Sequence, residues 1–148
     1  MNIREAKQED IIQLVLLFDG YRVFYRKESD VDQATIFLNK RLQEKDSQIF
    51  ICENKEGTLT GFVQLYPLFS SIRMKKLWLL NDLFVDPKYR GNGISKMLIE
   101  RSKQLVKETS ACGMFLETEK SNTIGNNLYP DTGFVLNSGS NFYEWNVE

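Results

Sequence analysis

Residues 89–96, YRGNGISK, place two glycines in a short connection that leaves an apolar strand and enters a helix. Gly91 and Gly93 permit positive φ angles and put no side chain between the backbone and a ligand. The first N–H groups of the following helix have no acceptor within that helix and point into the same concavity. Arg90 and Lys96 add positive charge. These residue types at this spacing favour a phosphate or pyrophosphate site, with a purely structural tight turn as the alternative.

Two nucleotide-binding loops have related patterns, and neither fits this segment. A Walker loop ends in Gly-Lys-Ser/Thr, whereas Gly93 is followed by Ile94 and Ser95. A dinucleotide-binding loop needs a third glycine where Lys96 stands, and its strand normally opens the chain. The sequence therefore disfavours a P-loop or dinucleotide-binding protein.

The chain contains no histidine. This excludes Ser-His-Asp and Cys-His hydrolases and any His-ligated zinc site, so acid-base chemistry falls to Tyr, Asp, Glu, Lys, Cys or water. Cys52 and Cys112 lie in apolar stretches without a partner cysteine at metal spacing. We predict that both are buried, reduced thiols and that the protein binds no metal.

Length and charge limit the class of protein and its partners. With 148 residues, the chain is predicted to form a single domain over residues 1–148. A formal net charge of -1 provides no global basic field that would indicate nucleic acid or an anionic membrane as partner. Met1 is not followed by a charged-apolar-small leader, and no apolar run approaches the roughly 18 residues of a membrane span. We therefore expect a cytoplasmic protein without nucleic-acid or membrane partners.

Hydrophobic periodicity predicts the elements that must hold the glycine loop. Residues 2–6 are predicted to form a strand and residues 7–26 a helix, because the apolar side chains of the second segment recur at helical spacing. Ser29 or Asp30 can cap a second helix over residues 31–44.

The pattern then changes to that of strands. Residues 47–54, 58–68 and 76–86 are rich in β-branched and aromatic side chains, and residues 54–57 are typical of a hairpin turn. These three segments predict an antiparallel meander that leads into the glycine loop.

After the glycine loop, residues 94–109 have helical periodicity and residues 112–119 form a short apolar segment, which together predict a right-handed parallel crossover. A short helix is predicted within residues 121–134, ending at a proline and a glycine, before a last pair of strands around Val135 and at residues 142–147. The predicted fold class is α/β (α+β), a mixed and mostly antiparallel sheet with helices on both faces.

The segment around the glycine loop resembles the GCN5-related N-acetyltransferase (GNAT) superfamily. In LNDLFVDPKYRGNGISKMLIE, residues 80–100, the positions of the family's Arg/Gln-x-x-Gly-x-Gly/Ala loop are occupied by Arg90, Gly93 and Ser95. Ser95 departs from the pattern, and it is small enough to let a pyrophosphate approach.

A second segment, NTIGNNLYPDTGF at residues 122–134, is similar to the family's Asn-x-x-Ala-x-x-Leu-Tyr-x-x-x-Gly-Phe, with Gly125 in place of alanine. The matched residues are Asn122, Leu128, Tyr129, Gly133 and Phe134. Residues 24–42 are more loosely similar to the amino-terminal region of the branch that contains yeast histone and D-amino-acid acetyltransferase homologues. The resemblance implies the GNAT acyl-CoA N-acyltransferase fold.

The resemblance also implies acetyl-CoA as cosubstrate, without a metal, and an amine as acetyl acceptor. By the same resemblance, Tyr129 is expected to protonate or hydrogen-bond the departing thiolate. Asn122 is expected to hydrogen-bond the cofactor, or to cap the helix that it precedes. The backbone of residues 83–85 is expected to pair with the pantetheine arm. The cofactor-binding positions implied by the resemblance are Leu83, Phe84, Val85, Arg90, Gly91, Asn92, Gly93, Ile94, Ser95, Lys96, Asn122, Asn126 and Tyr129.

The general base is the open question. Polyamine acetyltransferases, which this segment resembles, carry a glutamate at the position of Asn81, and asparagine cannot accept a proton as a base. Asp82 follows, but strand alternation turns it to the opposite face unless a bulge intervenes. Asp82 and Glu117 are the candidate bases, water-relayed deprotonation is the rival, and an ordinary ion pair is the alternative for either carboxylate.

Acceptor recognition is predicted only in outline. The aromatic residues that are candidates for an acceptor pocket, or else for the core, are Tyr21, Phe24, Tyr25, Tyr66, Phe69 and Trp78, and Glu28 or Asp30 could attract a cationic amine. The expected acceptor is a small-molecule or peptide amine, and the carboxyl-terminal strands suggest a homodimer. A non-catalytic acetyl-CoA-binding regulatory module is the alternative to an enzyme.

Overall fold

The computed structural model describes residues 1–147, which form two compact units, one of residues 1–117 and one from Thr118 onward. We describe each unit by itself. The single domain over residues 1–148 stays a prediction.

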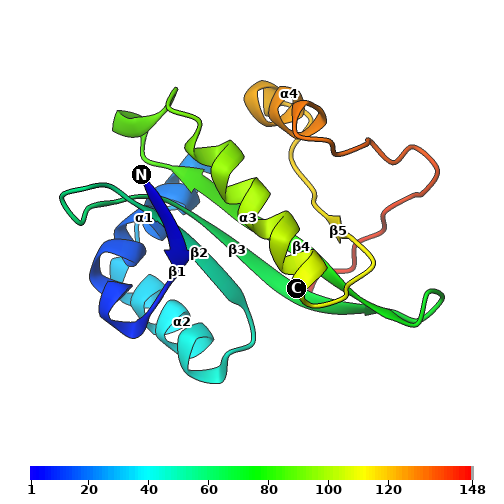
Figure 1. Ribbon diagram of the computed structural model, residues 1–148, viewed down its shortest axis with the longest axis horizontal. Helices are drawn as coiled ribbons and strands as arrows, with labels where there is room; N and C mark the ends of the chain where they lie inside the picture. Colours follow the sequence, from blue (N-terminus) through cyan, green and yellow to red (C-terminus); the bar gives the residue numbers. More distant parts are fainter. Residues whose placement is uncertain (148) are drawn as a thin grey trace. The chain divides into compact units, whose positions relative to one another are not determined.

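The first unit is built on a five-stranded sheet whose strands lie side by side in chain order (Figure 1). The strands are β1 (Asn2–Glu5), β2 (Gln48–Glu53), β3 (Leu59–Ser70), β4 (Lys75–Val85) and β5 (Met114–Phe115). Neighbouring strands are antiparallel from β1 to β4, and β4 and β5 are parallel. The predicted mixed, mostly antiparallel sheet is therefore confirmed.

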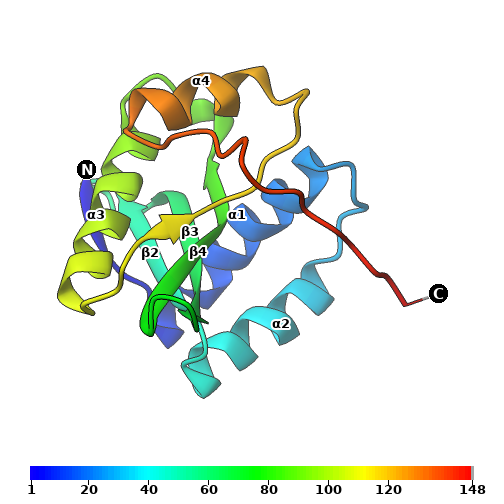
Figure 2. The ribbon, with the colours of Figure 1, turned by 90° about the vertical axis from the view of Figure 1, so that its right-hand side faces the viewer.

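Helices cover both faces of this sheet, with α1 and α2 on one face and α3 on the other (Figures 1 and 2). A 3₁₀ turn (Gln8–Asp10) precedes α1 (Ile11–Phe24), which is followed by α2 (Val31–Glu44), and α3 (Ile94–Glu108) follows a second 3₁₀ turn (Pro87–Tyr89). Asp30 is the residue that caps α2, because its carboxylate accepts from the Gln33 N–H at 3.0 Å.

The two faces of β3 show how the strand serves both layers. Phe62 is fully buried in the core with Leu14 and Phe18 of α1. The next residue towards the amino terminus, Gly61, faces α3, where an added Cβ would lie 3.2 Å from Ile94 Cγ2 and 2.9 Å from the Phe84 carbonyl oxygen. Glycine at this position therefore allows α3 and β4 to pack closely on the sheet.

A β-bulge in β4 changes which side chains face α1. Leu80 pairs with Leu65 and Asp82 pairs with Gln64, so Asn81 is an extra residue with no partner in β3. A bulge reverses the alternation of side chains beyond it. Asp82 therefore shares the face of Gln64, under α1. The sequence analysis expected Asp82 to face the other way unless a bulge intervened, and the structure contains that bulge.

Beyond Leu79, β4 has a strand neighbour only on its β3 side. β5 pairs with β4 only through Trp78 with Met114 and Leu79 with Phe115, so the predicted strand over residues 112–119 is limited to two residues. The parallel pairing itself confirms the predicted crossover through α3. The carboxyl-terminal half of β4 is left with a free backbone edge in the first unit.

The second unit consists of α4 (Thr123–Asp131) and an extended segment. The helix ends one residue after Pro130 and is followed by Gly133 with φ 93°. The two strands predicted around Val135 and at residues 142–147 are wrong, because residues 134–147 contain no strand. A strand needs a neighbouring strand for its backbone hydrogen bonds, and this unit, within its described residues, contains none.

Candidate active site

The glycine loop has the backbone conformation that the sequence predicts. Gly91 and Gly93 have φ angles of 80° and 74°, which side chains other than glycine rarely adopt. An added Cβ at either position would meet no atom within 4 Å, so open space lies in front of this backbone. Glycine is therefore required at these two positions by the positive φ angle and not by a neighbouring atom that would clash with a side chain.

The helix α3 begins directly behind this open space. Its first intrahelical hydrogen bond runs from the Met97 N–H to the Gly93 carbonyl oxygen at 3.1 Å, and Gly93 brings no capping side chain. Helix N-termini present N–H groups and a positive dipole end to anions. Ile94 is buried as an anchor of the helix, Ser95 is half-buried and Lys96 is exposed.

Two side chains predicted to touch the cofactor make hydrogen bonds within the loop region. Arg90 Nε donates to the Val85 carbonyl oxygen at 3.0 Å, and its guanidinium lies 5.5 Å from the centre of the Phe84 ring. Asn92 Nδ2 donates to the Tyr89 carbonyl oxygen at 2.9 Å. The Arg90 contact ties the loop to the end of β4, and the Asn92 contact ties it to the preceding 3₁₀ turn.

The residues present fit acetyl-CoA in two respects. The backbone of Leu83, Phe84 and Val85 belongs to the free edge of β4 and is half-buried, which suits pairing with an extended amide-bearing arm. The open glycine loop, which follows this edge after one 3₁₀ turn, suits a diphosphate.

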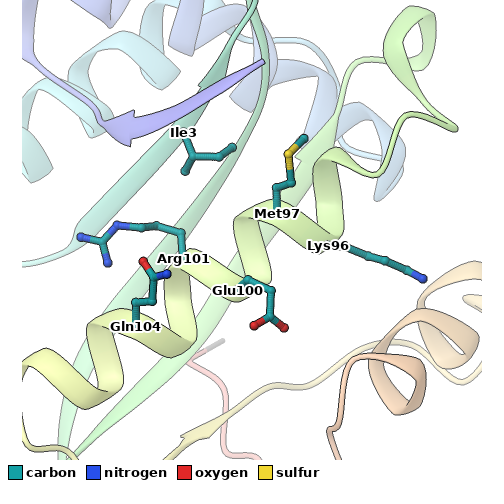
Figure 3. A pocket seen from close by; sticks show the side chains of 6 residues that line it. All are labelled: Ile3, Lys96, Met97, Glu100, Arg101 and Gln104. Atoms are coloured by element: carbon teal, nitrogen blue, oxygen red, sulfur yellow. The ribbon is translucent and has the colours of Figure 1, made fainter.

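A hollow of about 400 Å³ lies between α3 and β1 (Figure 3). Its lining residues are Ile3, Lys96, Met97, Glu100, Arg101 and Gln104. Of the residues predicted to bind the cofactor, Lys96 lines this hollow, whereas residues 90–93 do not.

Asp82 is a buried carboxyl with an organised set of donors. It is 3% exposed, its Oδ2 accepts from Gln64 Nε2 at 2.6 Å, and its Oδ1 accepts from Asn81 Nδ2 at 2.8 Å. The Tyr21 side chain also hydrogen-bonds to it. Burial raises the pKa of this carboxyl above its ordinary value, and the hydrogen bonds from Gln64, Asn81 and Tyr21 partly offset the rise.

Two of the predicted aromatic residues lie around this carboxyl. The Tyr21 hydroxyl donates to the Asn81 carbonyl oxygen at 3.2 Å, and its ring makes an edge contact with Tyr25, with centroids 5.1 Å apart. The pKa of Tyr66 is raised, first by burial and then by the negative charge of Asp82. A polar and aromatic cluster therefore lies between α1 and the bulge of β4.

The other predicted acceptor residues do not join this cluster. Trp78 lies on the opposite face, where its Nε1 donates to Thr109 Oγ1 at 2.9 Å, and Phe69 is 80% exposed near the end of the β3–β4 hairpin. Asp30 is used as the cap of α2. The carbonyl oxygen of Glu28 accepts from Arg22 at 3.0 Å. Phe24 is exposed at the end of α1.

Glu117, the second candidate base, differs from Asp82 in its surroundings. It follows β5 outside regular structure, and its side chain is exposed. An exposed carboxylate lacks the burial that makes Asp82 a better proton acceptor near neutral pH.

Gln64 is the site residue that the sequence analysis missed. It is fully buried, although it stands in an otherwise apolar strand segment, GFVQLY. That single amide within an apolar run was the available signal, since a buried polar side chain requires a partner.

In the second unit, Asn122 is the cap of α4. Its Oδ1 accepts from the Gly125 N–H at 3.1 Å, and its Nδ2 donates to Thr118 Oγ1 at 2.9 Å. Asn126 Nδ2 donates to the carbonyl oxygens of Asn122, at 2.8 Å, and Glu119, at 3.0 Å. Both amides therefore organise the start of the helix.

Gly125 explains one departure from the family pattern. A Cβ at this position would lie 2.6 Å from Asn122 Nδ2, closer than real contacts allow. The Tyr129 ring makes an edge contact with Phe134, with centroids 5.7 Å apart, and the Phe134 N–H donates to the Tyr129 carbonyl oxygen. The hydroxyl-bearing ring is thus held by the turn that ends α4.

Cys52 is buried and Cys112 is half-buried, and neither forms a disulfide. Among the described residues, His, Cys, Asp and Glu side chains form no group of three that could hold a metal ion. In the same part of the chain, every helix is too short or too polar to cross a membrane.

Comparison with known proteins identifies the family to which this fold belongs. Residues 14–134 match the family described as Acetyltransferase (GNAT) family. The chain belongs to this family, and the predicted GNAT fold is confirmed.

Three similar proteins show how far the likeness extends. The chain is 41% identical over 147 residues to the uncharacterized N-acetyltransferase YhfO of Bacillus subtilis (strain 168), covering 99% of this chain and 98% of that protein. A crystal structure of a probable acetyltransferase matches with a TM-score of 0.95 and 34% identity, covering 100% of this chain and 99% of the other. The aminoglycoside acetyltransferase meta-AAC0020 from a soil metagenome, in complex with sisomicin, shares only the fold, at 23% identity, a TM-score of 0.82 and coverage of 99% and 96%. The likeness to the branch with the yeast homologues stays a prediction.

Proposed function

We propose that this protein transfers an acetyl group from acetyl-CoA to a primary amine by direct attack of the amine on the thioester. The observation that carries this proposal is the free edge of β4, followed after one 3₁₀ turn by the open loop of Gly91 and Gly93 at the start of α3. A backbone edge followed by an anion-binding helix start suits a ligand with an amide-bearing arm and a diphosphate.

The reaction needs a neutral amine, a stabilised oxyanion and a protonated leaving group. Acetyl-CoA supplies the activated acetyl group. A primary amine with an ordinary pKa near 10.4 is mostly charged at neutral pH, so a basic group of the protein or a chain of water molecules must take its proton. Asp82 is the candidate for this role, because its buried carboxyl has a raised pKa. Backbone N–H groups of β4 are candidates for the oxyanion, and Tyr129 keeps its proposed role as the proton donor.

A non-catalytic acetyl-CoA-binding module is the second candidate. It is favoured by Asn81, which occupies the exposed position at the bulge where the polyamine enzymes carry a glutamate. Both functions require coenzyme binding, but only the enzyme releases free CoA in the presence of an amine.

The deciding experiment monitors free CoA with a panel of amines: spermidine, L-lysine, sisomicin, and a peptide with a free α-amine and one lysine. Sisomicin is included because of the fold relative that binds it. Amine-dependent CoA release that disappears without the acceptor supports the enzyme. Coenzyme binding by calorimetry without release by any amine supports the module, and absence of both contradicts the proposed function.

A further inference from the structure

Gln64 occupies a position where an amide is costly. Its side chain is fully buried at the centre of β3, directly opposite Asp82 in the ladder with β4. A buried amide is tolerated only when its groups are hydrogen-bonded, and an apolar side chain would pack here without that demand. The presence of Gln64 therefore calls for a reason beyond packing.

Both ends of this amide are occupied. The Ser47 hydroxyl donates to Gln64 Oε1 at 2.9 Å, and Gln64 Nε2 donates to Asp82 Oδ2 at 2.6 Å. Because Ser47 holds the oxygen, the amino group is turned towards the carboxylate. The opposite orientation would place an amide oxygen against a carboxylate oxygen, which is repulsive.

The groups that face Asp82 come from three elements. Gln64 and Tyr66 lie on β3, Asn81 on β4 and Tyr21 on α1, and all four are neutral hydrogen-bonding side chains. Two charged residues, Arg41 and Asp46, act on Tyr66 and pair with each other at 2.8 Å. The hydrogen bond from Gln64 is therefore a main support of the ionised form of Asp82.

Tyr21 is the side chain that connects this carboxyl with the outside. Asp82 is too deeply buried to contact an acceptor amine, whereas Tyr21 is half-buried. The Tyr21 hydroxyl donates to the Asn81 carbonyl oxygen at the bulge and lies within hydrogen-bond reach of the Asp82 carboxyl, so its single proton can turn to either acceptor. One hydroxyl can accept a proton on one side while it donates on the other.

We propose that Gln64, oriented by Ser47, is a positioning residue that keeps the Asp82 carboxylate ready to receive the proton of the acceptor amine through the Tyr21 hydroxyl. This inference rests on the proposed function. In the step, the Tyr21 hydroxyl proton turns from the Asn81 carbonyl oxygen to an Asp82 oxygen and binds it, while an ammonium N–H bond breaks and its proton binds the Tyr21 oxygen. The amine becomes neutral, Tyr21 remains neutral, and Asp82 becomes a carboxylic acid.

The test compares Gln64→Leu and Ser47→Ala with a matched control, Thr60→Val. Thr60 is also fully buried on β3, and its hydroxyl donates to the Cys52 carbonyl oxygen, away from Asp82. Two readouts are used. Carboxyl ¹³C NMR of the full chain follows the titration of Asp82 without any ligand, and pH profiles of kcat/KM use the panel amine with the highest turnover.

For Gln64→Leu, we expect the Asp82 titration and the acid limb of the pH profile to move together to higher pH, by about one unit. Activity then recovers above the displaced limb, which a merely structural defect would not allow. Ser47→Ala should move the Asp82 titration and the acid limb in the same direction by a smaller amount. Thr60→Val should move neither the titration nor the acid limb.

An acid limb that stays in place in a folded Gln64→Leu protein overturns the inference, whether or not the NMR titration moves. If Gln64→Leu fails to fold, Ser47→Ala at its half-buried position decides the matter by the same two readouts. Failure of the proposed function is distinguishable, because the wild-type protein then releases no CoA with any panel amine. In that case the inference is wrong as well. If the wild type releases CoA but the pH profiles of wild type and Gln64→Leu coincide, only this inference is wrong and the proposed function stands.

Discussion

Asp82 lies directly opposite Gln64 in the β3–β4 ladder, and the amide donates to the carboxylate at 2.6 Å. This pairing exists because Asn81 is an extra residue in β4 and turns Asp82 to the face that α1 covers. Without the bulge, Asp82 would lie on the same face as Leu80, under α3. One inserted residue therefore creates the buried carboxyl around which the proposed proton transfer is organised.

Replacing Gly93 by aspartate should weaken acetyl-CoA binding by at least about tenfold, since it adds bulk and negative charge where we propose the diphosphate. Asparagine tolerates the positive φ of 74° better than most residues and carries no charge, so Gly93→Asn is the matched control. Calorimetry on both folded variants separates charge from conformation. An aspartate variant that binds acetyl-CoA as tightly as wild type would contradict the diphosphate site.

Replacing Tyr129 by phenylalanine should lower kcat by roughly 10²-fold, because general acid catalysis typically contributes 10²- to 10⁴-fold. The acetyl-CoA affinity should change little, because the ring contact with Phe134 is kept. The check combines steady-state kinetics of CoA release with calorimetry. Unchanged kcat would remove Tyr129 from the mechanism, whereas weakened binding alone would make it a cofactor contact.

The raised pKa of Asp82 predicts a pH-dependent stability difference between wild type and Asp82→Asn. Because the folded-state pKa lies above the unfolded value, the protonated form is favoured in the folded protein. The stability that Asp82 contributes is fully present below the unfolded pKa of about 3.8 and is lost as pH rises through the folded pKa. The free energy of unfolding of Asp82→Asn relative to wild type should therefore increase from pH 3.5 to pH 7.

Urea unfolding of both proteins across this pH range measures that difference. Taking the difference cancels the titration of Asp10 and Glu53, whose pKa values are lowered, mainly by the hydrogen bonds from Arg4, and whose contributions run in the opposite direction. A difference that is constant with pH would mean that Asp82 titrates alike in the folded and unfolded chain.

Gly125→Ala should destabilise α4 by about 1 to 3 kcal/mol, because overpacking forces atoms to move. The clash is specific to the cap, since the new Cβ would lie 2.6 Å from Asn122 Nδ2. In an Asn122→Ser background, the same substitution should cost less, because serine keeps a capping oxygen on a shorter side chain. A double-mutant cycle of unfolding free energies measures the coupling, and strictly additive values would mean that the cap does not account for this glycine.

Most of the local structure could be predicted from the sequence. The helices at residues 11–24, 31–44 and 94–108 follow their apolar periodicity, and the turn at residues 54–57 is held as expected, with Asn54 Oδ1 accepting from the Thr58 N–H at 2.8 Å. The glycine loop could also be predicted, because a positive φ depends on the residue itself.

The carboxyl-terminal region shows the limit of such patterns. Residues 142–147 have the composition of a strand but have no neighbouring strand in their unit, and Phe142 and Trp145 are largely exposed. The predicted homodimer rested on those strands, so it stays a prediction without structural support. Residues 112–119 show the same limit, since β5 is only as long as its pairing with β4.

Helix periods, turn glycines and the two family segments are properties of neighbouring residues, so the sequence alone was enough to identify the loop and the family. The bulge at Asn81 and the bonds from Ser47 through Gln64 to Asp82 join residues from separate strands. Their geometry depends on strand register, and register is determined by the packing of the whole sheet between its helices. Only the folded structure could therefore show which carboxyl is buried and which amide holds it.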